Sequence, residues 1–143
     1  MRLSAKGEYG VRAMVHLALH YRDGPIPLSR IAADENISRQ YLEQIFFLLR
    51  KNGFITSVRG VKGGYFLASP PEEIFIGDII RVLEGPIIPV DCLSGKEEEE
   101  LFPCGKRERC LASNLWEKLR NQITQLLDNI SLQDMIESKQ WKY

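Results

Sequence analysis

One stretch decides the fold of this chain: Ile37-Ser38-Arg39-Gln40-Tyr41-Leu42-Glu43-Gln44-Ile45-Phe46-Phe47-Leu48-Leu49-Arg50-Lys51-Asn52-Gly53. Its apolar residues recur at the spacing of one buried helical face, at Leu42, Ile45, Phe46 and Leu49. Ser38 is a good N-cap, and Gly53 stands where a helix would end in a left-handed residue. The opposite face is polar, and such side chains can read base edges and phosphates in a DNA major groove.

Two short β-like runs follow this helix, at residues 54–58 and 65–68, with a basic, glycine-rich tip between them at residues 59–64. Two further helices precede it, predicted from about Ser4 to Tyr21 and from Ser29 to about Glu35, with Asn36 in the turn. The inward face of the first of these is predicted at Val11, Met14, Val15, Ala18 and Leu19. The pattern predicts a mainly α fold with a small β-hairpin wing, namely a winged helix-turn-helix.

We expect four segments along the chain. Residues 1–70 form the winged helix-turn-helix, residues 71–89 a connecting arm with a short helix, residues 90–112 a cysteine loop, and residues 113–143 a long helix followed by a short one. The long helix carries an apolar seam at coiled-coil spacing, formed by Trp116, Leu119, Ile123, Leu126 and Ile130. Since little chain remains to cover it, the seam predicts a two-fold homodimer.

The charge of the chain is divided unevenly. The net charge of the 143 residues is zero, but residues 1–68 hold ten Lys and Arg against five Asp and Glu. A basic first half predicts that this half meets a polyanion. No apolar run is long enough to cross a membrane, and the start lacks a signal segment, so we expect a cytoplasmic protein without a membrane partner. No catalytic constellation is present, which predicts that the protein is not an enzyme.

The expected partner is double-stranded DNA. We expect Gln40 to pair with adenine, and Glu43 to accept from cytosine and to penalise wrong sequences. Arg59 is expected at a base edge or in the minor groove, and Lys62 at a phosphate. The full set of predicted DNA-binding residues is Ser38, Arg39, Gln40, Tyr41, Glu43, Gln44, Arg50, Arg59, Gly60 and Lys62.

The three cysteines, Cys92, Cys104 and Cys110, lie in one irregular segment among charged and turn-forming residues rather than in apolar periodic positions. Thiolates favour such settings. Three chemistries stay open from the residues alone: an iron–sulfur cluster, a thiol–disulfide switch and zinc. Zinc generally shows closer Cys-x₂₋₄-Cys pairs than this chain has.

The sequence motifs resemble a known family. Residues 1–9, 37–46, 49–53 and 57–65 look like the IscR-type family of bacterial iron–sulfur cluster regulators, which also contains the nitric-oxide-sensing repressor NsrR. The resemblance covers essentially the whole chain. It implies a homodimeric transcription regulator that holds one cluster per subunit, of the [2Fe-2S] type, and controls iron–sulfur cluster biogenesis through cluster-dependent operator binding.

By position, the three cysteines match those that hold the cluster in the family. The chain departs from the family in a longer spacer between Cys92 and Cys104, and in having Ser113 where a ligating histidine stands. Glu8 is the candidate fourth ligand, since related regulators recruit an acidic residue there from the partner subunit; its alternative role is an exposed first-turn carboxylate. Two alternatives remain: a cluster-free regulator responding to thiol redox or a small molecule, and a winged-helix module that binds proteins.

Overall fold

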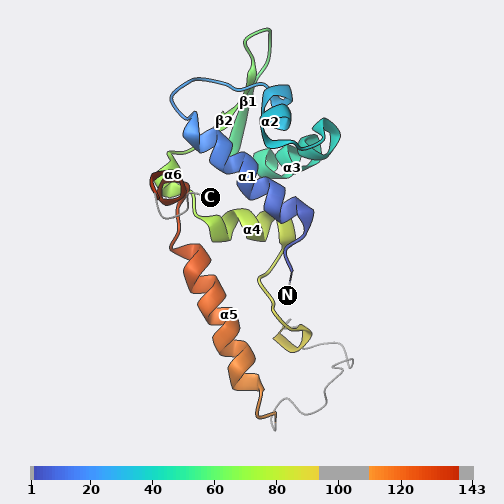
Figure 1. Cartoon of the computed structure of the whole chain (residues 1–143), viewed down its shortest axis with the longest axis vertical. Helices are drawn as coiled ribbons and strands as arrows, with labels where there is room; N and C mark the ends of the chain where they lie inside the picture. The colour runs from blue at the N-terminus through green and yellow to red at the C-terminus, as the bar shows by residue number, and fades with distance from the viewer. Residues whose placement is uncertain (1, 94–109, 139–143) are drawn as a thin grey trace.

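The computed structural model describes residues 2–93 and 110–138. Within these residues the chain is mostly helical, with one two-stranded antiparallel hairpin (Figure 1). The elements in order are α1 (Ala5–Leu19), α2 (Leu28–Glu35), α3 (Arg39–Lys51), β1 (Ile55–Val58), β2 (Gly64–Leu67), the 3-10 turn η1 (Pro71–Glu73), α4 (Ile76–Glu84), the 3-10 turn η2 (Asp91–Leu93), α5 (Ser113–Asp128) and α6 (Leu132–Glu137). The predicted winged helix-turn-helix is confirmed.

Helices α2 and α3 are joined by a tight turn. Asn36 ends α2 in the left-handed conformation, with φ of 53°, which asparagine tolerates better than most residues. Ser38 then caps α3 by accepting a hydrogen bond from the amide of Tyr41, at 3.2 Å. Gly53 follows α3 with φ of 81°. The local signals of the sequence therefore set both ends of the recognition helix.

The hairpin is attached to the helical body through Tyr65 of β2. Strands β1 and β2 pair from Ile55 with Leu67 to Val58 with Gly64. Tyr65 also forms an isolated antiparallel bridge with Ile26, which precedes α2. The ring of Tyr65 meets the buried ring of Phe46 edge to face, with centroids 4.9 Å apart. These contacts set the direction in which the wing projects from α3.

Helix α1 runs through the centre of the body and buries residues on its own stripe, at Gly7, Gly10, Ala13, Met14, His16, Leu17 and Ala18. The predicted inward position of Leu19 is wrong, because this side chain is 60% exposed. It lies at the last helical residue, beside the stripe that ends with Leu17 and Ala18. The buried stripe packs with α3 and α4 into one core that also includes the fully buried Leu42, Ile45, Leu49 and Ile79.

Long-range contacts form the lower part of the body. Phe75 pairs with Ser131 in an isolated antiparallel bridge, so the segment before α4 lies beside the segment before α6. Helix α4 begins at Ile76, directly after this bridge. Ser131 and Asp134 cap the start of α6 reciprocally.

The first helix is capped from a distance. Ser4 precedes α1, but its side chain makes no capping bond to the helix. The carboxylate oxygen Oε1 of Glu84, at the end of α4, instead accepts from the amides of Ser4 and Gly7, both at 3.0 Å, and from the Ser4 hydroxyl. Glu84 thus joins the start of α1 to the point where the chain leaves α4 for the cysteine segment.

Helix α5 extends away from the body, so its first turn and the tip of the wing lie at opposite ends of the molecule (Figure 1). None of its residues is buried. Across the part of the chain that the structure describes, no helix combines the length and apolar character needed to cross a bilayer.

Candidate nucleic-acid interface and cysteine segment

The outer face of α3 is open to solvent. Five of the side chains predicted to meet DNA are exposed there or at the cap, namely Ser38, Arg39, Gln40, Glu43 and Gln44. They lie opposite the buried Leu42, Ile45, Phe46 and Leu49, which anchor the helix to the core. A shallow open depression on this face is lined by Gln40, Glu43, Gln44, Phe47 and Leu48. The helix therefore presents amide and carboxylate groups on a rigid support.

Two arginines of α3 have partners on the protein itself. Arg39 pairs with Glu43 one turn later, with 3.4 Å between Nε and Oε1, and both side chains are more than half exposed. Arg50 donates from Nη1 to the hydroxyl of Ser57 on β1, at 3.2 Å. Because these contacts are exposed, they cost little to exchange for a phosphate. Arg50 also connects the end of α3 to the wing.

Tyr41 differs from the other predicted DNA-binding residues in being half-buried. Its ring meets that of Tyr9 edge to face, with centroids 5.9 Å apart. The guanidinium of Arg12 lies over the Tyr9 ring, 5.4 Å from its centroid. The aromatic body of Tyr41 thus helps to hold the first turn of α3 against α1.

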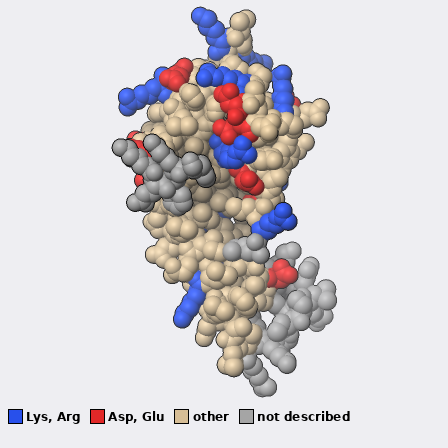
Figure 2. Space-filling model, viewed as in Figure 1, with Lys and Arg blue, Asp and Glu red and all other residues tan. Residues whose placement is uncertain are grey.

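The wing tip is basic and exposed. Arg59, Gly60, Val61 and Lys62 are all open to solvent, and Val61 is fully exposed. Gly60 has φ of 112°, a conformation that favours glycine, and its carbonyl accepts from the amide of Gly63 at 3.0 Å. Figure 2 shows Lys and Arg side chains around the upper part of the molecule, where α1 to α3 and the wing lie.

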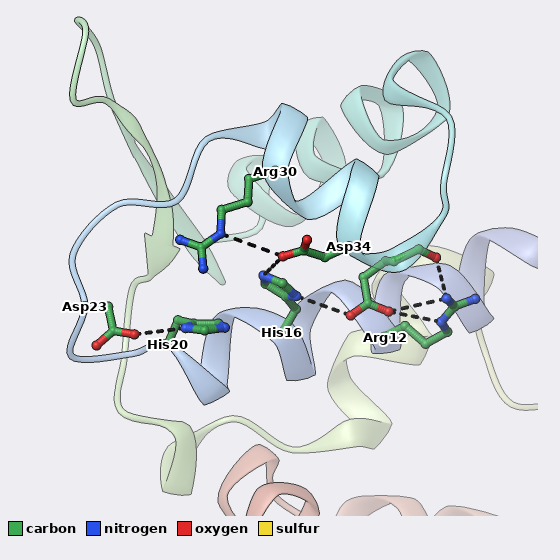
Figure 3. A network of polar contacts seen from close by, with 7 residues as sticks. Arg12, His16, His20, Asp23, Arg30 and Asp34 are labelled. Carbon is green, nitrogen blue, oxygen red and sulfur yellow. Dashed lines mark hydrogen bonds and ion pairs between the residues drawn. The ribbon is translucent and has the colours of Figure 1, made fainter. Parts of the chain in front are cut away.

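A polar network docks α2 onto α1 (Figure 3). His16 of α1 is 5% exposed; its Nδ1 lies 3.2 Å from Glu35 Oε1, and its Nε2 lies 3.7 Å from Asp34 Oδ2. Arg12 pairs with Glu35 at 3.3 Å, and Arg30 with Asp34 at 3.7 Å. Because α2 buries only three of its own side chains, this network supplies much of what orients the helix-turn-helix.

One side of α5 is apolar and is only partly covered within the described residues. Ile130, from the predicted seam, follows the end of the helix and packs against the core. Trp116, Leu119, Ile123 and Ile130, from the predicted seam, are half-buried, and Leu126 is 59% exposed. Leu115, beside the seam, is 57% exposed. Few charges lie over this part of the molecule in the face that Figure 2 shows.

One ion pair fastens the end of α5 to α4. Arg81 donates from Nη2 to Asp128 Oδ2 at 2.8 Å, and Asp78 lies 3.2 Å from Nη1 of the same guanidinium. The hydrogen bond to Asp128 raises the pKa of Arg81 above its ordinary value, so the group stays charged at every working pH. The pair fixes the base of α5 against the body.

Two of the three cysteines lie among the described residues. Cys92 is in η2 and Cys110 precedes α5; both are free thiols and half-buried. Cys104 lies outside the described residues. Ser113 is the first residue of α5 rather than its cap, and its hydroxyl donates to the carbonyl of Cys110 at 2.8 Å. Within residues 2–93 and 110–138, no three His, Cys, Asp or Glu side chains gather closely enough to hold a metal ion.

The predicted fourth ligand lies on a different element from the cysteines. Glu8 is exposed in the first turn of α1. Helix α1 belongs to the body, whereas η2 lies further along the arm toward the free end of α5 (Figure 1). The described residues of one subunit therefore do not bring Glu8 into a group with Cys92 and Cys110.

Three features of this surface escaped the sequence analysis. Phe47 is 59% exposed on the outer face of α3, and a check of the helical period would have placed it off the buried stripe. The bond between Arg50 and Ser57 joins two different elements, α3 and β1, and the cap that Glu84 gives to α1 joins residues 77 positions apart. No local pattern in the sequence marks either of them.

Comparison with known proteins is consistent with this architecture. Residues 3–138 match the Rrf2 family model, which is described as "Iron-dependent Transcriptional regulator". The chain is 41% identical over 140 residues to the HTH-type transcriptional regulator IscR of Pectobacterium atrosepticum, an alignment that covers 98% of this chain and 82% of the relative.

Two solved structures have the same fold over nearly their whole length. One is CymR of B. subtilis, titled the global cysteine regulator, at 44% identity and TM-score 0.77, covering 94% of this chain and 95% of that one. The other is IscR of T. potens, at 37% identity and TM-score 0.76, covering 100% and 93%. The relatives are named as regulators of transcription and not as enzymes, as the sequence predicts. The chain belongs to the Rrf2 family of transcriptional regulators.

Proposed function

We propose that this protein is a homodimeric, operator-binding regulator whose DNA affinity is controlled by a [2Fe-2S] cluster, and that its targets are genes of iron–sulfur cluster biogenesis. The observation that carries this is the combination of an open, polar face on α3 with free thiols in η2 and just before α5. The 41% identity to an IscR regulator over nearly the whole chain supports it.

The first half of the chain would supply both the side chains that recognise bases and the positive charges that contact phosphates. Helix α3 has 13 residues and is therefore about 20 Å long, and the diameter of a helix with its side chains, about 10–12 Å, matches a major groove about 12 Å wide. Arg59 and Lys62 at the wing tip are placed to reach phosphates or the neighbouring minor groove. Phosphate neutralisation releases counterions, so binding should weaken steeply as salt rises.

The dimer is the arrangement that would cover α5. A helix of 16 residues with none buried leaves Trp116, Leu119 and Ile123 only half-buried and Leu126 exposed among the described residues. Pairing with the same helix of a second subunit buries that face, and two-fold symmetry places two copies of α3 on two half-sites. The ion pair from Arg81 to Asp128 then transmits the position of α5 to the body.

The donor chemistry suits an iron–sulfur cluster. Cys92 and Cys110 are half-buried free thiols, and with Cys104 they provide three thiolates, which such clusters prefer. Glu8 would complete the set from the partner subunit. A bound cluster would supply a redox-active group, and the fraction of protein that carries it would depend on iron supply and on oxidants. Cys92 and Cys110 would tie the arm after α4 to the start of α5, and so bias the spacing of the recognition helices.

The test is the visible spectrum with iron and sulfide content after purification without oxygen. We expect near-equal iron and sulfide, lost in Cys92→Ala and Cys104→Ala. Glu8→Gln should leave iron bound but shift the spectrum, whereas Glu73→Gln, at an exposed carboxylate of η1, should change nothing. A colourless, iron-free protein that still binds duplex DNA would overturn cluster control and leave the DNA-binding role intact.

A second candidate is a cluster-free regulator that responds to thiol oxidation or to a small molecule. The likeness to CymR, whose title names it a cysteine regulator, favours this alternative. The hydrogen bond from the Ser113 hydroxyl to the Cys110 carbonyl also favours it. Ser113 stands where the family has a ligating histidine, and here its hydroxyl is engaged in a local hydrogen bond. This candidate predicts that oxidant changes the DNA affinity of an iron-free sample, and that Cys92→Ser removes the change.

A further inference from the structure

Phe47 is an aromatic side chain held out into solvent from the recognition helix. It is 59% exposed, whereas its neighbour Phe46 is 1% exposed and packs on Tyr65. The buried faces of α3 and the wing are already filled by Phe46 and its partners. Nothing in the core therefore requires an aromatic residue at position 47.

The surroundings of Phe47 are those of a base-reading surface. Gln40, Glu43 and Gln44 precede it by seven, four and three residues, so all four side chains share one face of the helix. Together with Leu48 they line the same shallow depression. Amide and carboxylate groups at such positions pair with base edges in a major groove, and an apolar side chain there can contact the methyl group of thymine.

The charges around this face favour a polyanion over a protein partner. Arg39, Arg50 and Lys51 of α3 are exposed, and the basic wing tip follows β1. Protein-binding surfaces are built from contiguous apolar patches depleted in charge. Here one exposed ring stands among polar side chains, and Leu48 is partly packed against the core.

We infer that Phe47 reads thymine by packing against 5-methyl groups in the major groove, as a specificity determinant beyond the polar residues of α3. This rests on the proposed insertion of α3 into the groove. Phe47 lies seven residues after Gln40, which is about 10 Å along the helix, or about three base-pair steps. The two side chains therefore address different base pairs.

The experiment uses duplexes selected from a random pool by the purified protein. In the tightest duplex, each thymine is replaced in turn by deoxyuridine, which removes only the methyl group, and affinity is measured by fluorescence anisotropy. We expect about fourfold weaker binding by the wild type at one position in each half-site, the factor that goes with burying one methyl-sized group. Phe47→Ser should bind all these duplexes without that loss, and Phe47→Leu should retain part of it.

Two further readouts separate this inference from the proposed function. The slope of affinity against salt should be the same for Phe47→Ser and wild type, because the ring neutralises no phosphate. Wild-type indifference to every deoxyuridine, or an unchanged deoxyuridine profile in Phe47→Ser, would overturn the inference while DNA binding stands. A change in the sedimentation of Phe47→Ser would also overturn it, since the ring would then serve a protein interface. Absence of duplex binding at any salt would overturn the proposed function itself.

Discussion

Replacing Glu84 should destabilise the whole body through the start of α1. The carboxylate accepts from the amides of Ser4 and Gly7, both at 3.0 Å. Loss of a helix cap costs about 1 kcal/mol, and loss of a negative charge at a helix N-terminus about 0.3–1 kcal/mol more. For Glu84→Ala we therefore expect a loss of about 1–2 kcal/mol, which corresponds to a fall in Tm of about 5 °C for a chain of this size.

The assay is thermal unfolding followed by circular dichroism at 222 nm. Glu84→Gln keeps an oxygen acceptor but loses the charge, so its Tm should fall by about half as much. Glu73→Ala, at an exposed carboxylate of η1, is the matched control and should stay within 1 °C of the wild type. A Glu84→Ala variant with unchanged Tm would show that water caps α1 equally well. A glutamine variant as damaged as the alanine variant would show that charge alone matters.

Three further changes test other parts of the structure. Glu43→Ala should lower the ratio of specific to non-specific DNA affinity by about tenfold, measured by anisotropy on selected and scrambled duplexes, because a carboxylate repels phosphates and can accept from cytosine; an unchanged ratio would remove this role. Leu126→Lys should shift the protein toward monomer in sedimentation velocity, whereas Leu19→Lys, at an equally exposed leucine of α1, should not; equal effects would argue against the seam. Gly10→Ala should lower the urea concentration at the midpoint of unfolding, because a Cβ there would overlap Leu83. Overpacking costs about 1–3 kcal/mol, whereas the gain in helix propensity is about 1 kcal/mol. A raised midpoint would show that Leu83 moves aside.

Local signals carried most of what could be predicted. The cap at Ser38 and the left-handed Asn36 each depend on residues within a few positions. Amphipathic spacing likewise identified the buried side of α3 and its exposed polar side. Such features depend only on short stretches of sequence, so the physical rules for helices and turns predict them directly.

What escaped prediction depends on distant parts of the chain. Ser4 was placed at the start of α1, yet the groups that need a cap find it in Glu84, 80 residues later. The exposure of Leu19 depends on which stripe of α1 the other helices cover. Each of these outcomes requires knowing the tertiary packing first.

The polar docking of α2 has a consequence for how salt titrations of this protein are interpreted. The pairs of Arg12 with Glu35 and of Arg30 with Asp34 are partly exposed, so added salt screens them as well as the contacts to phosphate. An apparent count of released counterions then includes some loosening of the helix-turn-helix itself. Measuring unfolding over the same salt series would separate the protein's own ionic response from that of the DNA.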